Sequence, residues 1–185
     1  MKGLRIRFLF LFIVVALLLV SLITYRSLNN YMEEVKLIRH SNSVIKSAQQ
    51  VLSTIKDAEI GYRGFQLTRD TVFLEPYYSA IQLLPGQLTE LDSLVAGDTV
   101  QQYQVDSLKL LINDQFLIIA NILSNARTTN LFMDRYETTL LSRSRKNLIT
   151  IRQVVKVLSY NEHQVFEKRI GYEEDYKFIA PIALL

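Results

Sequence analysis

The chain has 185 residues, no cysteine and a formal net charge of +3. Its 21 lysines and arginines exceed its 18 acidic residues by three, and Lys2, Arg5 and Arg7 supply three of those cations, so the remainder has no net charge. The basic balance is therefore no sign of nucleic-acid binding. The absence of cysteine excludes a disulfide framework and a thiolate metal site.

An apolar run near the N-terminus predicts a membrane-spanning helix. Residues 8–23 are apolar except for Ser21, which approaches the ~20 residues that a helix needs to cross a bilayer. We expect the span to cover residues 8–25. Three cations precede it and one follows closely, which places residues 1–7 in the cytoplasm by the positive-inside rule.

The alternative is a cleavable signal peptide, because basic residues precede an apolar core of moderate length. No A-x-A-like pair of small residues follows this core, where Leu22, Ile23 and Arg26 occupy candidate cleavage positions. The sequence therefore favours an uncleaved anchor, with residues 26–176 outside the cytoplasmic membrane.

Two amphipathic segments follow the anchor, each with apolar or small residues at alternating steps of four and three. This is the spacing of a bundle or coiled-coil seam. The first stripe consists of Val44, Ala48, Val51, Ile55, Ala58, Tyr62 and Phe65, and the second of Tyr77, Ile81, Leu84, Leu88, Leu91 and Val95. Pro85-Gly86 interrupts the second segment, so we expect a kink or a break in that helix.

Two more helical segments complete the pattern. The third follows the Gly97-Asp98 turn, and Thr99-x-x-Gln102 is a possible capping box at its start. Its stripe contains Leu108, Leu111, Ile118 and Ile122. The fourth stripe contains Leu141, Ser144, Leu148, Ile151, Val155, Leu158, Glu162, Val165 and Arg169, and becomes polar towards its end. We expect the boundary between these two helices within residues 126–134.

These segments predict an all-α fold, because no stretch shows the period-two alternation of strands. Four helices of this kind imply an antiparallel up-down four-helix bundle, which returns the chain to the side where it began. Residues 177–185 are largely apolar and predict the start of a second transmembrane helix that is cut short. The first and fourth helices are then expected to continue into the spans.

The end of the first segment, DAEIGYRGFQLT at residues 57–68, and FLEPY at residues 73–77 resemble the signature of the third class of CHASE domain. The similarity extends over about residues 40–175. Family-signature positions are Asp57, Glu59, Gly61, Arg63, Gly64, Phe65, Leu67, Thr68, Glu75, Pro76, Tyr77, Arg152, Glu162 and Arg169. Pro85-Gly86 departs from the uninterrupted helix that the family leads us to expect.

The resemblance implies an extracellular four-helix sensory domain of a bacterial signalling receptor, between two membrane helices. In that family the second span leads to a cytoplasmic output module, most often a histidine kinase and sometimes a nucleotide cyclase or a chemotaxis-type region. The chain would then be the N-terminal input fragment of such a receptor, with any enzymatic activity in a part that is missing here.

The signature residues have two interpretations. Glu59 and Arg63 form an i, i+4 pair, Gly61 and Gly64 allow close helix approach, and the motif would then only build the corner between two helices. In that corner Leu67-Thr68 would end one helix, and Pro76 would lie in the first turn of the next. The second interpretation is a polar site for a charged or hydrogen-bonding ligand, formed by Asp57, Glu59 and Arg63.

Other sites find little support in the sequence. It has no P-loop, G-x-S-x-G or H-E-x-x-H motif, so we expect no catalytic residue and no cofactor. His163 and Glu167 are spaced i, i+4, but two ligands make a poor metal site, and none is expected. The basic residues Arg143, Arg145, Lys146 and Arg152 are most simply a solvated face, although some could line a dimer seam.

The function that the sequence predicts is an extracytoplasmic input domain in the cytoplasmic (inner) membrane. It would pass a stimulus through its first and fourth helices, contact membrane lipid, form a homodimer and bind an unknown ligand or partner protein, but no nucleic acid. One alternative is an anchored interaction module without its own small-molecule ligand. Another is a structural spacer.

Overall fold

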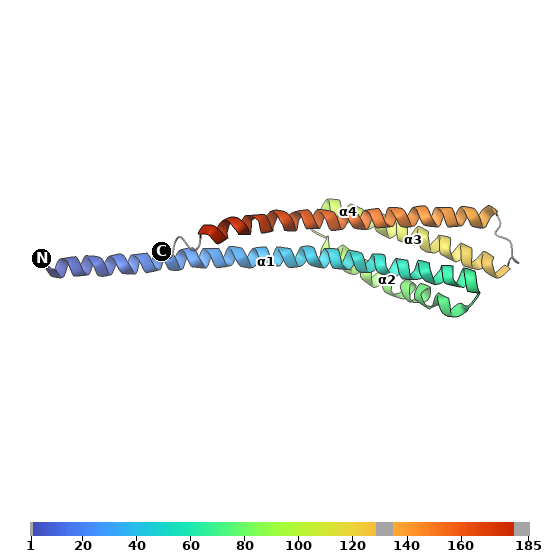
Figure 1. Cartoon of the computed structure of the whole chain (residues 1–185), viewed down its shortest axis with the longest axis horizontal. Helices are drawn as coiled ribbons and strands as arrows, with labels where there is room; N and C mark the ends of the chain where they lie inside the picture. The colour runs from blue at the N-terminus through green and yellow to red at the C-terminus, as the bar shows by residue number, and fades with distance from the viewer. Residues whose placement is uncertain (1, 129–134, 180–185) are drawn as a thin grey trace. The chain divides into compact units, whose positions relative to one another are not determined.

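The computed structural model describes the backbone of residues 2–128 and 135–179, and the side chains of residues 7–124 and 138–164. Within these residues the chain is all-α, with four α-helices, one short 3-10 helix and no strand. The elements are α1 (Lys2–Thr68), η1 (Thr71–Leu74), α2 (Glu75–Leu94), α3 (Thr99–Thr128) and α4 (Arg135–Ile179) (Figure 1). The predicted boundary between the last two helices involves residues 129–134, which lie outside the described residues.

The chain divides into two compact units, Met1–His40 and Ser41–Leu185. In the first unit the large apolar side chains of residues 8–23 are exposed, by up to 72% at Phe12. This part of α1 is long and apolar enough to cross a membrane. Residues 99–124 of α3 pass the same test, but 39% of their apolar window is buried, as expected of a helix in a bundle core. The limits of the span at residues 8 and 25 stay a prediction.

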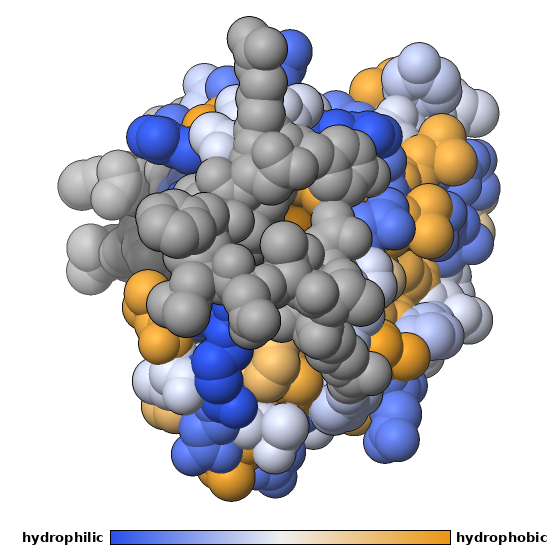
Figure 2. All heavy atoms as spheres, turned by 90° about the vertical axis from the view of Figure 1, so that its right-hand side faces the viewer, coloured by the Kyte–Doolittle hydropathy of each residue, from blue (hydrophilic) through white to orange (hydrophobic). Residues whose placement is uncertain are grey.

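In the second unit, residues 41–68 of α1 pack with α2, α3 and α4, and successive helices run in opposite directions (Figure 1). The first predicted stripe is confirmed in full, because all seven of its residues are buried. The end of the bundle at which α1 gives way to α2 shows hydrophilic and hydrophobic residues interleaved on its visible surface (Figure 2). A mixed surface of this kind suits contact with water.

The second stripe is confirmed except at one position, although Leu88 is only half-buried. Ile81 is 45% exposed, and Ala80 lies in the core instead, at 1% exposure. The physical reason is the period of the helix, because 3.6 residues per turn place the inward face of α2 between these two positions. The side chain of Ala80, which is smaller than that of Ile81, therefore occupies the buried position.

Pro85 does not break α2, which continues from Glu75 to Leu94 with this proline inside it. Of the two predicted alternatives the break is therefore wrong, and the kink stays a prediction. Proline removes the hydrogen bond that the carbonyl of Ile81 would accept. Ile81, Pro85 and Gly86 are all exposed, so that carbonyl can be hydrated and the cost of the missing bond is reduced.

The third and fourth stripes also form the core, although Leu111 and Leu141 are only half-buried. Val165 and Arg169 lie outside the residues whose side chains are described. The sequence patterns missed several buried residues of α3, namely Val105, Ile112, Ile119 and Leu123. With these residues α3 is buried over a wider face than a single seam requires.

The corner between α1 and α2 follows the prediction. α1 ends at Thr68, and Arg69 adopts a left-handed conformation (φ 60°) while its amide donates to the carbonyl of Phe65 at 2.8 Å. The carboxylate of Asp70 then accepts a hydrogen bond from the amide of Val72, which caps η1. Pro76 lies in the first turn of α2, where its missing N–H costs nothing.

The cap of α3 differs from the predicted capping box. Asp98 is the capping residue, because its carboxylate accepts hydrogen bonds from the amides of Val100 (2.8 Å) and Gln101 (3.0 Å). Gln102 donates its side chain to the carbonyl of Ala96. Asp98 lies one residue before Thr99, and its carboxylate accepts hydrogen bonds from two backbone amides. A threonine hydroxyl in the capping position would satisfy these amides less fully.

Replacing Asp98 with alanine should lower the free energy of unfolding by about 1 kcal/mol, because two amides at the start of α3 lose their acceptor. Thr99→Ala serves as the matched control and should have a smaller effect. Guanidinium unfolding of the chain in detergent, followed by circular dichroism, measures both. A larger loss in Thr99→Ala than in Asp98→Ala would restore the predicted capping box.

Candidate functional site

Gly61 and Gly64 lie against the 3-10 helix, and neither has room for a methyl group. A Cβ atom at Gly61 would lie 2.6 Å from the carbonyl oxygen of Phe73, and one at Gly64 would lie 2.5 Å from the ring of Phe73. The two glycines therefore allow the close approach that the sequence predicts, with η1 as the neighbour. They fix the position of α1 against the start of α2.

Several signature residues are structural or lie on the surface. Phe65 and Tyr77 are buried in the core, and Tyr77 stacks on Phe116 of α3. Asp57, Leu67, Thr68 and Glu75 are exposed. Of the three residues proposed as a polar ligand site, Asp57 lies two residues before Glu59, about 200° around the helix, and so on a different face of α1.

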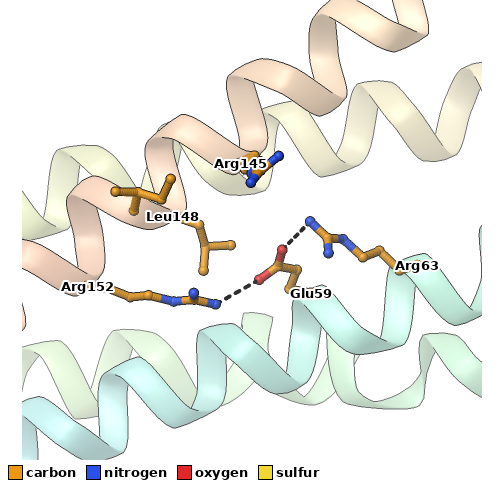
Figure 3. A pocket seen from close by; sticks show the side chains of 6 residues that line it. Glu59, Arg63, Arg145, Leu148 and Arg152 are labelled. Carbon is orange, nitrogen blue, oxygen red and sulfur yellow. Dashed lines mark ion pairs between the residues drawn. The ribbon is translucent and has the colours of Figure 1, made fainter.

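Glu59 and Arg63 come together with Arg152 of α4 (Figure 3). Arg63 lies 2.5 Å from one carboxylate oxygen of Glu59, and Arg152 lies 3.7 Å from the other. The side chain of Glu59 is 9% exposed, whereas those of the two arginines are about half exposed (49% and 51%). A buried carboxylate thus has one cation from its own helix and one from the facing helix.

An open cavity of about 460 Å³ adjoins this ion pair, between α1 and α4. We call it the arginine cleft. It is lined by Glu59, Arg63, Arg145, Leu148, Ile149 and Arg152. In Figure 3 the side chains of Arg152 and Arg63 lie on either side of Glu59, with Arg145 above them.

The guanidinium of Arg63 stays charged in this setting. Partial burial alone would lower its pKa, but a hydrogen bond with Tyr62 and the negative charge of Glu59 outweigh that effect and raise the pKa above its ordinary value. The cleft therefore holds its positive charge over the whole physiological range of pH.

A buried polar network crosses the core beside the cleft. The hydroxyls of Tyr62 and Ser144 lie 3.1 Å apart, and the side-chain amide of Gln115 donates to Ser144 at 2.8 Å. Asn147 donates to the side-chain oxygen of Gln115 and to the backbone carbonyl of Leu111. The network joins α1, α3 and α4 at a level where the core would otherwise be apolar.

A second polar contact lies where α3 begins. Gln101 donates its side-chain amide to the carboxylate of Glu162, and both residues are buried. This contact places Glu162, a signature residue, against the first turn of α3. The side chain of Arg169 lies outside the described residues, so its predicted role stays untested.

Metal binding gains no support from the part of the chain that the structure describes, since it contains no group of three potential ligands among His, Cys, Asp and Glu. His163 is exposed. The side chain of Glu167, its proposed partner, is outside the described residues.

The sequence reasoning missed Arg145, Leu148 and Ile149 as cleft residues. Arg145 and Arg152 were interpreted as part of a solvated face, and both are indeed exposed, yet they line the cavity. Their spacing of seven residues places them on the same side of α4, which was the available signal. The rotation of α4 that turns these residues towards Glu59 could not be predicted from the sequence.

Replacing Gly61 with alanine should lower the free energy of unfolding by about 1–3 kcal/mol, because the new methyl group forces the backbone of Phe73 to move. Gly86→Ala is the matched control, since nothing lies within 4 Å of a Cβ atom there. That change should stabilise the chain by about 0.5–1 kcal/mol through helix propensity. Equal effects of the two changes, measured by guanidinium unfolding, would contradict the close approach.

Replacing Ser144 with alanine should lower the free energy of unfolding by about 1–3 kcal/mol, because Tyr62 and Gln115 both lose a buried partner. Ser142→Ala, two residues away on the exposed face of α4, measures the gain in helix propensity that the same chemical change brings. If the two variants unfold at the same denaturant concentration, the network does not stabilise the bundle.

Comparison with known proteins agrees with the signature. The family model described as CHASE3 domain matches residues 35–171, which is more than half of the chain. No curated protein and no solved structure matches the chain.

Proposed function

Because the chain belongs to the CHASE3 domain family, a family of extracellular sensory domains of signalling receptors, we propose that it is the input part of a transmembrane receptor. The class that we propose is the two-component sensor histidine kinase in the cytoplasmic membrane, with a nucleotide cyclase as the alternative output. A second span would begin near residue 177, and catalysis would belong to a cytoplasmic module that follows this span. The receptor would act as a homodimer.

One observation supports this proposal most directly. α1 is a single helix from Lys2 to Thr68, so it contains both the apolar run and the family signature. α4 likewise continues to Ile179, beyond its buried residue Glu162. A change in the packing of α1 or α4 within the bundle could therefore reach the membrane along unbroken helical hydrogen bonds. Couplings of about 1–3 kcal/mol are typical of such transmission.

The arginine cleft favours ligand sensing over the alternative of an interaction module without a ligand. A fully packed bundle would favour the interaction module, whereas a cavity lined by convergent polar groups is typical of a binding site. Here three guanidinium groups and a carboxylate line the cavity. The cleft also lies between α1 and α4, the two helices proposed to transmit the signal.

The helical phase of α4 provides a test of the coupling. In the complete receptor, one alanine inserted after Lys168 should change autophosphorylation with labelled ATP, because it rotates the following residues by about 100° relative to the bundle. Seven inserted residues should restore the wild-type level, since they return the helix to within about 20° of its original phase.

One alanine inserted at Gly97, in the turn between α2 and α3, is the control and should leave phosphorylation unchanged. If the one-residue and the seven-residue insertions in α4 give equal phosphorylation, signal transmission through α4 is contradicted. Phosphate that is never found on histidine would contradict the kinase assignment, and formation of a cyclic nucleotide would favour the cyclase.

A further inference from the structure

The arginine cleft has more positive charge than its own acidic residue can neutralise. Its lining contains three guanidinium groups and one carboxylate, which leaves a net charge of +2. Guanidinium groups are always protonated in proteins, so the cleft keeps its three positive charges. The three arginines are exposed to solvent, and all of them line the same cavity between two helices.

Two of the three arginines keep hydrogen-bond donors free for a ligand. Arg152 lies 3.7 Å from Glu59, which is too far for a hydrogen bond. Arg145 forms no ion pair or hydrogen bond with any residue that the structure describes. Each guanidinium offers five N–H donors in a planar fork that suits the oxygens of a carboxylate or a phosphate.

We propose that the arginine cleft binds a small oxyanion with two negative charges, of the phosphate or short dicarboxylate type. Such a ligand matches the net charge of the cleft. Arg145 and Arg152 of α4 and Arg63 of α1 would donate to its oxygens, while Leu148 and Ile149 form an apolar wall beside it. The role of this anion as a stimulus rests on the proposed receptor function, but its binding does not.

The proposal also assigns a role to Glu59. Its carboxylate occupies the place of an anion between Arg63 and Arg152 and competes with the ligand for both (Figure 3). A bound oxyanion would share these guanidinium groups with Glu59 and link α1 to α4 through additional charge-assisted hydrogen bonds. The ligand would thereby favour one packing of the two helices over another.

Isothermal titration of the full chain in detergent with inorganic phosphate, sulfate and succinate tests the proposal, with sodium chloride at equal ionic strength as the reference. At least one of the three anions should bind at millimolar concentration or below and raise the unfolding temperature. Arg145→Gln should weaken that binding at least about tenfold, since it removes a charge-assisted contact. It should not lower the stability of the ligand-free chain.

Two further variants give results that a general loss of structure cannot mimic. Glu59→Gln keeps the size of the side chain but removes the competing charge, so it should strengthen anion binding. Lys146→Gln removes a cation next to Arg145 that does not line the cleft, and should leave binding unchanged.

Binding of none of the three anions beyond the chloride reference would overturn the proposal. So would an equal loss of binding in Lys146→Gln and Arg145→Gln, or unchanged binding in Arg145→Gln. If the anion binds as expected while the insertions in α4 leave signalling unchanged, the anion site stands and the proposed coupling fails.

Discussion

Glu59 places a carboxylate between two packed helices of this bundle, and that negative charge has to be neutralised. An unpaired buried charge costs several kcal/mol, and the removal of one partner from a buried pair commonly costs about 3–5 kcal/mol. Arg63 of the same helix and Arg152 of α4 provide the neutralising positive charges. The two helices are therefore aligned where the three charges meet. Arg145 adds a third guanidinium group to the lining of the cleft, so the cations there outnumber the single carboxylate.

The core that surrounds this ion pair is not uniformly apolar. Tyr62, Ser144, Gln115 and Asn147 form a polar layer, and Gln101 with Glu162 forms a contact at the other end of the packed region. Polar layers that are fully satisfied select one register, because any shift leaves a group without a partner. The side-chain oxygens of Gln104 and Ser159 are buried and have no hydrogen-bond partner in the described part of the chain.

Most of the fold could be predicted from the chain, because heptad stripes report which face of a helix is buried. The α1 stripe and the corner at Pro76 followed from local rules alone. Ile81 and the capping box at Thr99 failed by one residue each, since a stripe or a motif does not fix the rotation of a helix to better than that. Glu59, Arg63 and Arg152 were identified through the family signature. Arg145 was not, because its role depends on how α4 is turned towards α1, and that is decided by tertiary packing.

The length of α4 beyond Glu162 has a mechanical consequence for the proposed signalling. Glu162 lies against the first turn of α3, and α4 then continues through residues 163–179, a length of about 25 Å at ~1.5 Å per residue. Under the proposed transmission through α4, this helix would act as a lever arm with its fulcrum near Glu162. A tilt of about 5° at the fulcrum moves the far end by about 2 Å over that length. Rearrangements in the bundle that are too small to disturb its core would thus be enlarged before they reach the end of the helix.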